Sequence, residues 1–265
     1  MTFPQLELPS LSSGWAGDEP EGVVTRAALY SAVYESRRAD LAVYLGLAAA
    51  APGPVLELGA GSGRLLAPLL AKGIDAYGLE CDAESVAASR RRLEALGVPS
   101  ERSLSGDMRD FDLGRRFASI FVVANTVSLL LEQADVDAML SCVRRHLAPD
   151  GAFVFDVSRV EGFAWYAPPY VWRGEPEGVW VAGKAATSVE RGSYDPVTRR
   201  CSVTREFELQ DGRSAALHTL THQRSIEDWI ASLSRAGFEV ARPIDERGGD
   251  IEPTSTLVFL RSGLA

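Results

Sequence analysis

Cysteine, lysine and long hydrophobic runs are all scarce in this sequence of 265 residues. The three cysteines, Cys81, Cys142 and Cys201, are odd in number and far apart, so their spacing predicts neither a disulfide framework nor a metal site. The longest apolar stretch, near residues 41–51, is too short to span a bilayer. Because the chain also opens without a charged segment followed by an apolar one, we expect a protein of the reducing cytoplasm.

Acidic residues outnumber basic ones, 36 to 27. Only Lys72 and Lys184 accompany the arginines, and the formal net charge is -9. Without a basic block, strong nonspecific binding to nucleic acid or to anionic membranes is not expected. We therefore predict a small-molecule acceptor as partner, no nucleic acid and no membrane, and the sequence leaves a homo-oligomer open. With 46% apolar residues, the chain is able to bury a full core as one elaborated domain.

The most informative segment is the run Pro54-Val-Leu-Glu-Leu-Gly-Ala-Gly-Ser-Gly-Arg64. It predicts a buried strand, a turn of three alternating glycines and the start of a helix, the order that builds a nucleotide cradle. The G-x-G-x-x-G spacing of dinucleotide sites fails because position 64 is arginine. No Gly-Lys-Ser/Thr follows, which disfavours a phosphate-binding loop.

Two acidic residues follow at the ends of the next predicted strands. Glu80 ends the strand at 75–80, where its carboxylate is able to accept both hydroxyls of a ribose. Asp107 and Met108 follow the strand at 102–106 and offer a carboxylate for an adenine amino group and an apolar side chain for its ring.

These elements, in this order and at these intervals, resemble the class I S-adenosylmethionine (SAM) dependent methyltransferases. The resemblance runs from about residue 30 to residue 156 and more loosely to the C-terminus. It implies SAM as cofactor, S-adenosylhomocysteine as product, and a cofactor site formed by Tyr30, Arg38, Glu57, Gly59, Ala60, Gly61, Glu80, Cys81, Asp107, Met108 and Asn125. The alternative is an α/β domain whose glycine-rich turn is only a tight connection. For Tyr30 and Arg38, an ordinary amphipathic helix is the competing interpretation.

Strands alternate with helices up to residue 157, which predicts an α/β fold with a doubly wound, mostly parallel sheet. The resemblance implies seven strands in a Rossmann-like methyltransferase, closed by an antiparallel hairpin. We expect helices at 64–72, 83–96 and 133–146, and strands at 75–80, 102–106, 117–124 and 151–157.

The chain is predicted to divide into four parts. These are an irregular arm at 1–24, N-terminal helices and SAM-binding core at 25–157, an inserted antiparallel lid at 158–224, and completion of the core at 225–265. Arg90, Arg91 and Arg92 are predicted to form a solvated helix face.

Candidate residues for the acceptor come from three segments. Tyr166, Tyr170 and Trp172 belong to an aromatic and proline-rich stretch that we interpret as a substrate lid or, alternatively, as the small core of the insert. Asn125 follows an apolar strand at the carboxyl edge of the sheet, where doubly wound folds bind ligands. His218 and His222 are predicted to share one face of a strand. His222 and Asn125 are the catalytic candidates. The two histidines have no third ligand at a suitable spacing, so we predict no metal site.

The function expected from these features is methyl transfer to a small, aromatic or otherwise apolar specialised metabolite. The stretch 106–117 resembles sugar N-methyltransferases of antibiotic pathways. However, Leu129 falls where amino-sugar dimethyltransferases of this type carry a histidine, which weakens a sugar acceptor. The alternatives are therefore an amino-sugar N-methyltransferase and a noncatalytic SAM-binding protein.

Overall fold

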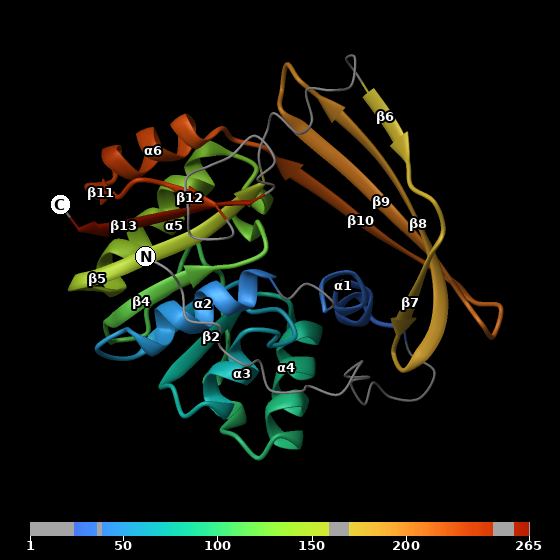
Figure 1. Ribbon diagram of the computed structural model, residues 1–265, viewed down its shortest axis with the longest axis horizontal. Helices are drawn as coiled ribbons and strands as arrows, with labels where there is room; N and C mark the ends of the chain where they lie inside the picture. Colours follow the sequence, from blue (N-terminus) through green and yellow to red (C-terminus); the bar gives the residue numbers. More distant parts are fainter. Residues whose placement is uncertain (1–23, 36–38, 159–169, 246–256, 265) are drawn as a thin grey trace.

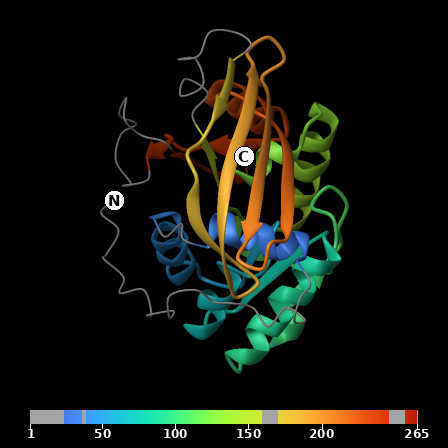
Figure 2. The same cartoon turned by 90° about the vertical axis from the view of Figure 1, so that its right-hand side faces the viewer.

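The computed structural model describes residues 24–35, 39–158, 170–245 and 257–264, and it contains two sheets (Figure 1). The larger sheet is mostly parallel and forms the core with helices on both faces. The smaller sheet is antiparallel and stands beside the core, with one helix between them (Figures 1 and 2). The arrangement is α/β with an antiparallel insertion, as predicted.

The core sheet has seven strands in a row, in the order β11-β13-β5-β4-β1-β2-β3. Only β13 runs antiparallel, pairing with β5 on one side and β11 on the other, and the short strand β12 adds to it. The strand bounds are β1 Val55–Leu58, β2 Ala76–Glu80, β3 Ser103–Ser105, β4 Phe117–Val122, β5 Leu147–Ser158, β11 Phe238–Val240, β12 Ile244–Asp245 and β13 Leu257–Leu264.

Helices cover both faces of this sheet because β1 and β4, at its centre, are buried throughout. One face packs on α2, α3 and α4 around Tyr44, Leu66 and Phe121, and the other packs on α5 and α6 around Leu140 and Trp229. The helix bounds are α1 Arg26–Tyr34, α2 Ala39–Ala49, α3 Leu66–Ala71, α4 Ala83–Ala95, α5 Gln133–His146 and α6 Ile226–Arg235, with short 3-10 turns η1 Ser100–Arg102 and η2 Thr126–Leu129.

Local signals explain where several helices begin. The Asp82 carboxylate caps α4 by accepting from the backbone N–H of Ser85, and Ser225 with Asp228 forms a capping box at α6. At the C-terminal end of α5, His146 is buried and its Nδ1 lies 2.8 Å from the carbonyl of Cys142. Its Nε2 accepts from the N–H of Leu113, so the ring caps the end of the helix.

The second sheet lies between β5 and α6 in the sequence. Its strands are β6 Tyr170–Arg173, β7 Glu177–Val181, β8 Lys184–Asp195, β9 Arg200–Leu209 and β10 Ser214–His222. They run in the order β10-β9-β8-β6, with β7 also on β8. Helix α1 packs against this sheet, where Leu29 joins an apolar cluster with Val181, Phe207 and Leu217.

The arginines of α4 do not form a uniformly solvated face, and this prediction was wrong for Arg92. The side chain of Arg92 is 1% exposed and pairs with Glu35, just after α1. A buried guanidinium requires a charge partner, and that partner comes from a distant part of the chain. Arg90 is also engaged, since it donates to the carbonyl of Ser103.

Candidate active site

The glycine turn after β1 has the backbone conformation that the sequence predicts. Gly59, Gly61 and Gly63 have φ values of 71°, 53° and 80°, in the left-handed region that favours glycine. A Cβ on Gly59 would lie 2.7 Å from the Thr126 methyl group, whereas a Cβ on Gly61 would meet nothing within 4 Å. Gly61 therefore borders open space, and Gly59 is enclosed by neighbouring residues.

Glu80 bends back from the end of β2 onto this turn. Its Oε2 accepts from the N–H of Gly61 at 2.9 Å, and its Oε1 accepts from the N–H of Asp82 at 2.8 Å. A carboxylate offers about four acceptor positions, so the two that remain are available for the hydroxyls of a ribose. Cys81 follows directly, and burial together with the Glu80 charge raises its thiol pKa to about 11. The thiol is therefore neutral at physiological pH.

Glu57 lies below the same turn on β1 and is 4% exposed. Burial raises its carboxyl pKa to about 8, Arg64 opposes this shift, and nearby Glu80 and Asp40 increase it. Its Oε2 has no hydrogen-bond partner within the described structure. Arg64 itself is held by Asp40 of α2 through contacts of 2.5 and 3.0 Å. In the free protein the Glu57 carboxyl is therefore neutral at physiological pH, and it offers a ligand hydrogen-bonding groups rather than a negative charge.

Asp107 and Met108 lie beyond β3, on the far side of the turn. Arg109 donates to both Asp107 oxygens, and this hydrogen bonding holds the pKa of the Asp107 carboxyl below its usual range. Met108 approaches Gly59, since its terminal methyl would lie 3.3 Å from a Cβ there. The two residues thus offer an ionised carboxylate and an apolar surface beside the glycine turn.

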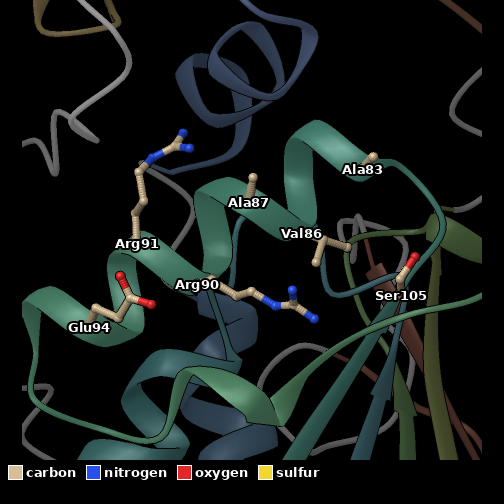
Figure 3. Close-up of a pocket in the computed structure, with 7 residues that line it drawn as sticks. All are labelled: Ala83, Val86, Ala87, Arg90, Arg91, Glu94 and Ser105. Carbon is tan, nitrogen blue, oxygen red and sulfur yellow. The ribbon is translucent and has the colours of Figure 1, made fainter.

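An open pocket lies next to this end of the site, between α4 and the edge strand β3. It is lined by Ala83, Val86, Ala87, Arg90, Arg91, Glu94 and Ser105. Figure 3 shows Val86 and Arg90 on the side of α4 that faces Ser105, two residues before Asp107. The pocket is thus bordered by the strand that leads to Asp107 and Met108.

Helix α1 contacts the glycine turn through Ser31, whereas the predicted residue Tyr30 packs toward the second sheet. Ser31 and Ser62 approach each other, with their hydroxyl oxygens 2.9 Å apart, so α1 lies against the glycine turn. Tyr30 stacks on Tyr34 with ring centroids 6.0 Å apart and packs with the cluster of the second sheet. Arg38 lies outside the described residues.

Asn125 follows β4 at the carboxyl edge of the sheet, as expected. Its backbone N–H donates to the Asp156 carboxylate, and its φ is 57°. The sequence also predicts Thr126 beside the turn, as part of the segment 125–128, and the structure places its methyl group against Gly59. Sequence reasoning missed Asp156. The signal for Asp156 was a carboxylate in the otherwise apolar strand at 151–157.

The predicted acceptor residues are not all brought to this edge. Trp172 covers Gly192 of β8, and its indole N–H donates to Glu190 at 3.0 Å, so it packs within the second sheet. Tyr166 and the side chain of Tyr170 lie outside the described part of the chain. His222 ends β10 and its Nδ1 lies 2.9 Å from the carbonyl of Leu131. Burial lowers the His222 pKa, so the neutral ring keeps an Nε2 lone pair.

His218 and His222 share one face of β10, as predicted. Register and alternation place that face opposite the one that carries Leu217 and Phe207. His218 is exposed and contacts Thr204. Among the described residues, no three His, Cys, Asp or Glu side chains are grouped to hold a metal ion, and no helix is both long and apolar enough to cross a membrane.

The geometry of the turn fits SAM. Open space at Gly61, the remaining acceptor positions of Glu80 and the Asp107–Met108 pair match the sugar and base of a nucleoside. Below the turn, the buried Glu57 carboxyl has an oxygen without a partner, which suits a polar group of the methionyl part. The residues that would hold the cofactor are thus those around β1, β2 and β3.

Comparison with known proteins agrees with this geometry. Residues 55–151 match the family model described as a methyltransferase domain. The chain is 29% identical over 244 residues to a dTDP-3-amino-3,6-dideoxy-alpha-D-glucopyranose N,N-dimethyltransferase of Streptomyces fradiae, covering 86% of this chain and 89% of the relative. It is 25% identical over 221 residues to a dTDP-3-amino-3,4,6-trideoxy-alpha-D-glucopyranose N,N-dimethyltransferase of Streptomyces venezuelae, covering 78% and 84%.

A solved structure shares the fold. The SAM-bound amino pentose methyltransferase from Micromonospora echinaspora superimposes with a TM-score of 0.67 at 24% identity, covering 88% of this chain and 96% of that one. The sheet order, the glycine turn and these similarities agree on one family. The chain is therefore similar to the class I SAM-dependent methyltransferases in fold, cofactor turn and sequence, and its activity is SAM-dependent methyl transfer.

Proposed function

We propose that this enzyme methylates the amino group of a small polar acceptor, with a nucleotide-linked amino sugar as the acceptor class. The observation that carries the proposal is the similarity to two dTDP-amino-sugar N,N-dimethyltransferases, which extends well beyond the matched methyltransferase domain. The sequence alone favours an apolar aromatic acceptor, with an amino sugar as the alternative. These relatives support the alternative.

A band of polar side chains on the second sheet supports a polar acceptor. Arg205 of β9 pairs with Glu190 of β8 at 2.7 Å and approaches the buried hydroxyl of Ser188 at 3.5 Å. By register, this band lies on the same face as Phe207, which packs with α1. Figure 1 shows α1 between the second sheet and the core. The band separates the apolar cluster at α1 from the cluster of Tyr194 and Cys201. An acceptor with hydroxyl, amine or phosphate groups would find partners there.

The chemistry of an amine acceptor is compatible with the residues present. SAM supplies the activated methyl group when bound. A neutral amine is already a nucleophile, so the protein mainly has to orient it, and positioning supplies up to roughly 7–11 kcal/mol of the barrier reduction. The exposed Leu129 at the carboxyl edge, where the amino-sugar relatives were expected to carry histidine, provides no proton acceptor.

The test is a methylation assay with dTDP-3-amino-3,6-dideoxyglucose and SAM, followed by mass spectrometry. We expect products heavier by one and two methyl groups. The matched control is the same nucleotide sugar with hydroxyl in place of the amine, which should remain unmodified. Methylation of phenols or aromatic amines, with no reaction on the amino sugar, would contradict the proposal and favour an aromatic acceptor. Binding of S-adenosylhomocysteine with no turnover on either class would favour a noncatalytic SAM-binding protein.

A further inference from the structure

Two consecutive residues after β4 adopt the left-handed backbone conformation, which residues other than glycine and asparagine rarely take. Ala124 has φ 60° and Asn125 has φ 57°. In this left-handed region the Cβ crowds the backbone, and such strain persists only where the surroundings hold it. The sequence offers no glycine at either position, so the restraint has to come from elsewhere in the fold.

One buried carboxylate provides that restraint. Asp156, near the end of β5, is fully buried, and its Oδ1 accepts from the N–H of Ala124 at 2.9 Å while its Oδ2 accepts from the N–H of Asn125 at 2.8 Å. The hydroxyl of Tyr44 in α2 donates to Oδ1 at 2.7 Å. Both oxygens are thus satisfied, as a buried carboxylate requires.

The restrained turn lies directly against the cofactor turn. Strands β1 and β4 are neighbours in register, with Leu58 opposite Val122, so the segments that follow them meet at one edge of the sheet. Thr126 projects its methyl group over Gly59, within 2.7 Å of where a Cβ would stand. A shift of the turn after β4 would therefore displace Thr126 relative to Gly59.

We propose that Asp156 is a positioning residue of the methyltransferase site. By holding Ala124 and Asn125 in the left-handed conformation, it sets Thr126 against Gly59 and keeps Asn125 at the edge where the cofactor turn lies. Asp156 acts through the backbone of the turn. The assignment depends on the SAM site and is independent of the acceptor.

The test has to separate positioning from a purely structural role. Loss of a buried hydrogen-bond network lowers the melting temperature in either case. Only a positioning residue also weakens cofactor binding in molecules that remain folded. The readout is therefore the dissociation constant of S-adenosylhomocysteine by calorimetry, at a temperature where circular dichroism shows the variant to be folded.

Asp156→Asn should weaken S-adenosylhomocysteine binding roughly tenfold, which corresponds to about 1.4 kcal/mol. The asparagine side chain has one oxygen and one NH2 group. The oxygen still accepts from one backbone N–H, whereas the NH2 group faces the other N–H and cannot accept from it, so only one of the two left-handed residues stays hydrogen-bonded. The control is Phe153→Leu in the same strand, because Phe153 packs on Phe155 and Phe238 in the core. It should lower the melting temperature and leave the dissociation constant unchanged.

A second substitution identifies the route. Glycine adopts positive φ without strain, so Ala124→Gly in the Asp156→Asn background should recover most of the lost affinity. If Asp156→Asn proves too unstable to measure, Tyr44→Phe removes one donor from the same carboxylate and should give a smaller loss that Ala124→Gly again reverses. Wild-type affinity in the destabilised variants would overturn the proposal. Failure of Ala124→Gly to restore binding would equally refute action through the turn.

Discussion

At the scale of single residues, Glu57 is a carboxyl group whose charge changes when the protein folds. It is surrounded by titratable and charged side chains from several elements, namely Asp40 and Tyr44 of α2, Arg64 before α3, and Glu80 of β2. Burial is the largest effect on the Glu57 carboxyl and favours its neutral form. Its pKa of about 8 means that the folded protein binds a proton that the unfolded chain releases near pH 4.5.

The first prediction follows from this difference. Between pH 4.5 and about 8 the folded state binds more protons at Glu57 than the unfolded state, so the contribution of Glu57 to stability falls as pH rises, by about 1.4 kcal/mol per pH unit. Glu57→Gln mimics the neutral form and should flatten this dependence. Urea unfolding at pH 6 and pH 8.5 measures the free energy of unfolding of both proteins. If the difference between wild type and Glu57→Gln is the same at the two pH values, the prediction is wrong.

The second prediction concerns Glu80, which we assign to the ribose. Glu80→Ala should weaken binding of S-adenosylhomocysteine by about 1–3 kcal/mol, the usual loss on removing a charged hydrogen-bonding partner. Glu101→Ala, at an exposed carboxylate of η1, is the matched control and should bind as the wild type does. Calorimetric titration with S-adenosylhomocysteine measures both affinities. An unchanged affinity in Glu80→Ala would show that Glu80 does not bind the ribose.

The third prediction concerns His222. Its Nδ1 contacts the Leu131 carbonyl, and its position in β10 lies on the face opposite the polar band of Arg205 and Glu190. General bases contribute typically 10²–10⁴-fold to turnover. We expect His222→Gln to retain kcat within tenfold at saturating acceptor between about pH 6 and 9. A loss of 10²-fold or more would instead assign the proton transfer to His222.

Local chemistry explains which site residues could be predicted. The glycines and Glu80 are recognised because a turn and a strand end carry their signals within a few residues. Asp156 and Arg92 could not be assigned in the same way, since their partners Ala124 and Glu35 are distant in sequence. Pairings of this kind depend on how the sheet and helices meet.

At the scale of elements, the sequence predicted the core well because its strands and helices alternate with clear glycine and proline breaks. The helix expected at 133–146 is α5 with the same bounds. The strand expected at 117–124 instead ends at Val122, because Ala124 and Asn125 turn into the left-handed region. The strand expected at 151–157 begins earlier, at Leu147.

Strand β6 gives the fourth prediction. Trp172 occupies the space over Gly192, where any Cβ would collide with its ring, and its N–H satisfies Glu190. Such an aromatic side chain over a strand glycine supports the sheet. Trp172→Ala should therefore lower stability by about 1–3 kcal/mol without changing S-adenosylhomocysteine affinity. Thermal unfolding and calorimetry measure the two effects, and weaker cofactor binding with an unchanged melting temperature would contradict this role.

At the scale of the whole molecule, ligand binding should stabilise the fold, because the cofactor turn joins β1, β2 and α3 in the core. The fifth prediction is that S-adenosylhomocysteine at 100 times its dissociation constant raises the unfolding free energy by about 2.7 kcal/mol. A chelator should not alter this gain, since the proposed cofactor contacts are organic groups of the chain. Differential scanning calorimetry with and without EDTA tests both statements, and loss of the gain in EDTA would indicate a required metal.

The packing of α1 on the second sheet has a consequence for how acceptor choice is inherited. Leu29 and Ala28 share an apolar cluster with Val181, Phe207 and Leu217, although more than a hundred residues separate the helix from the sheet. The structural module beside the core is therefore discontinuous in the gene. An exchange of strands β6 to β10 between relatives would leave a foreign sheet on a native helix. Recombination that preserves this contact has to transfer both segments together, so the two are expected to evolve as one unit.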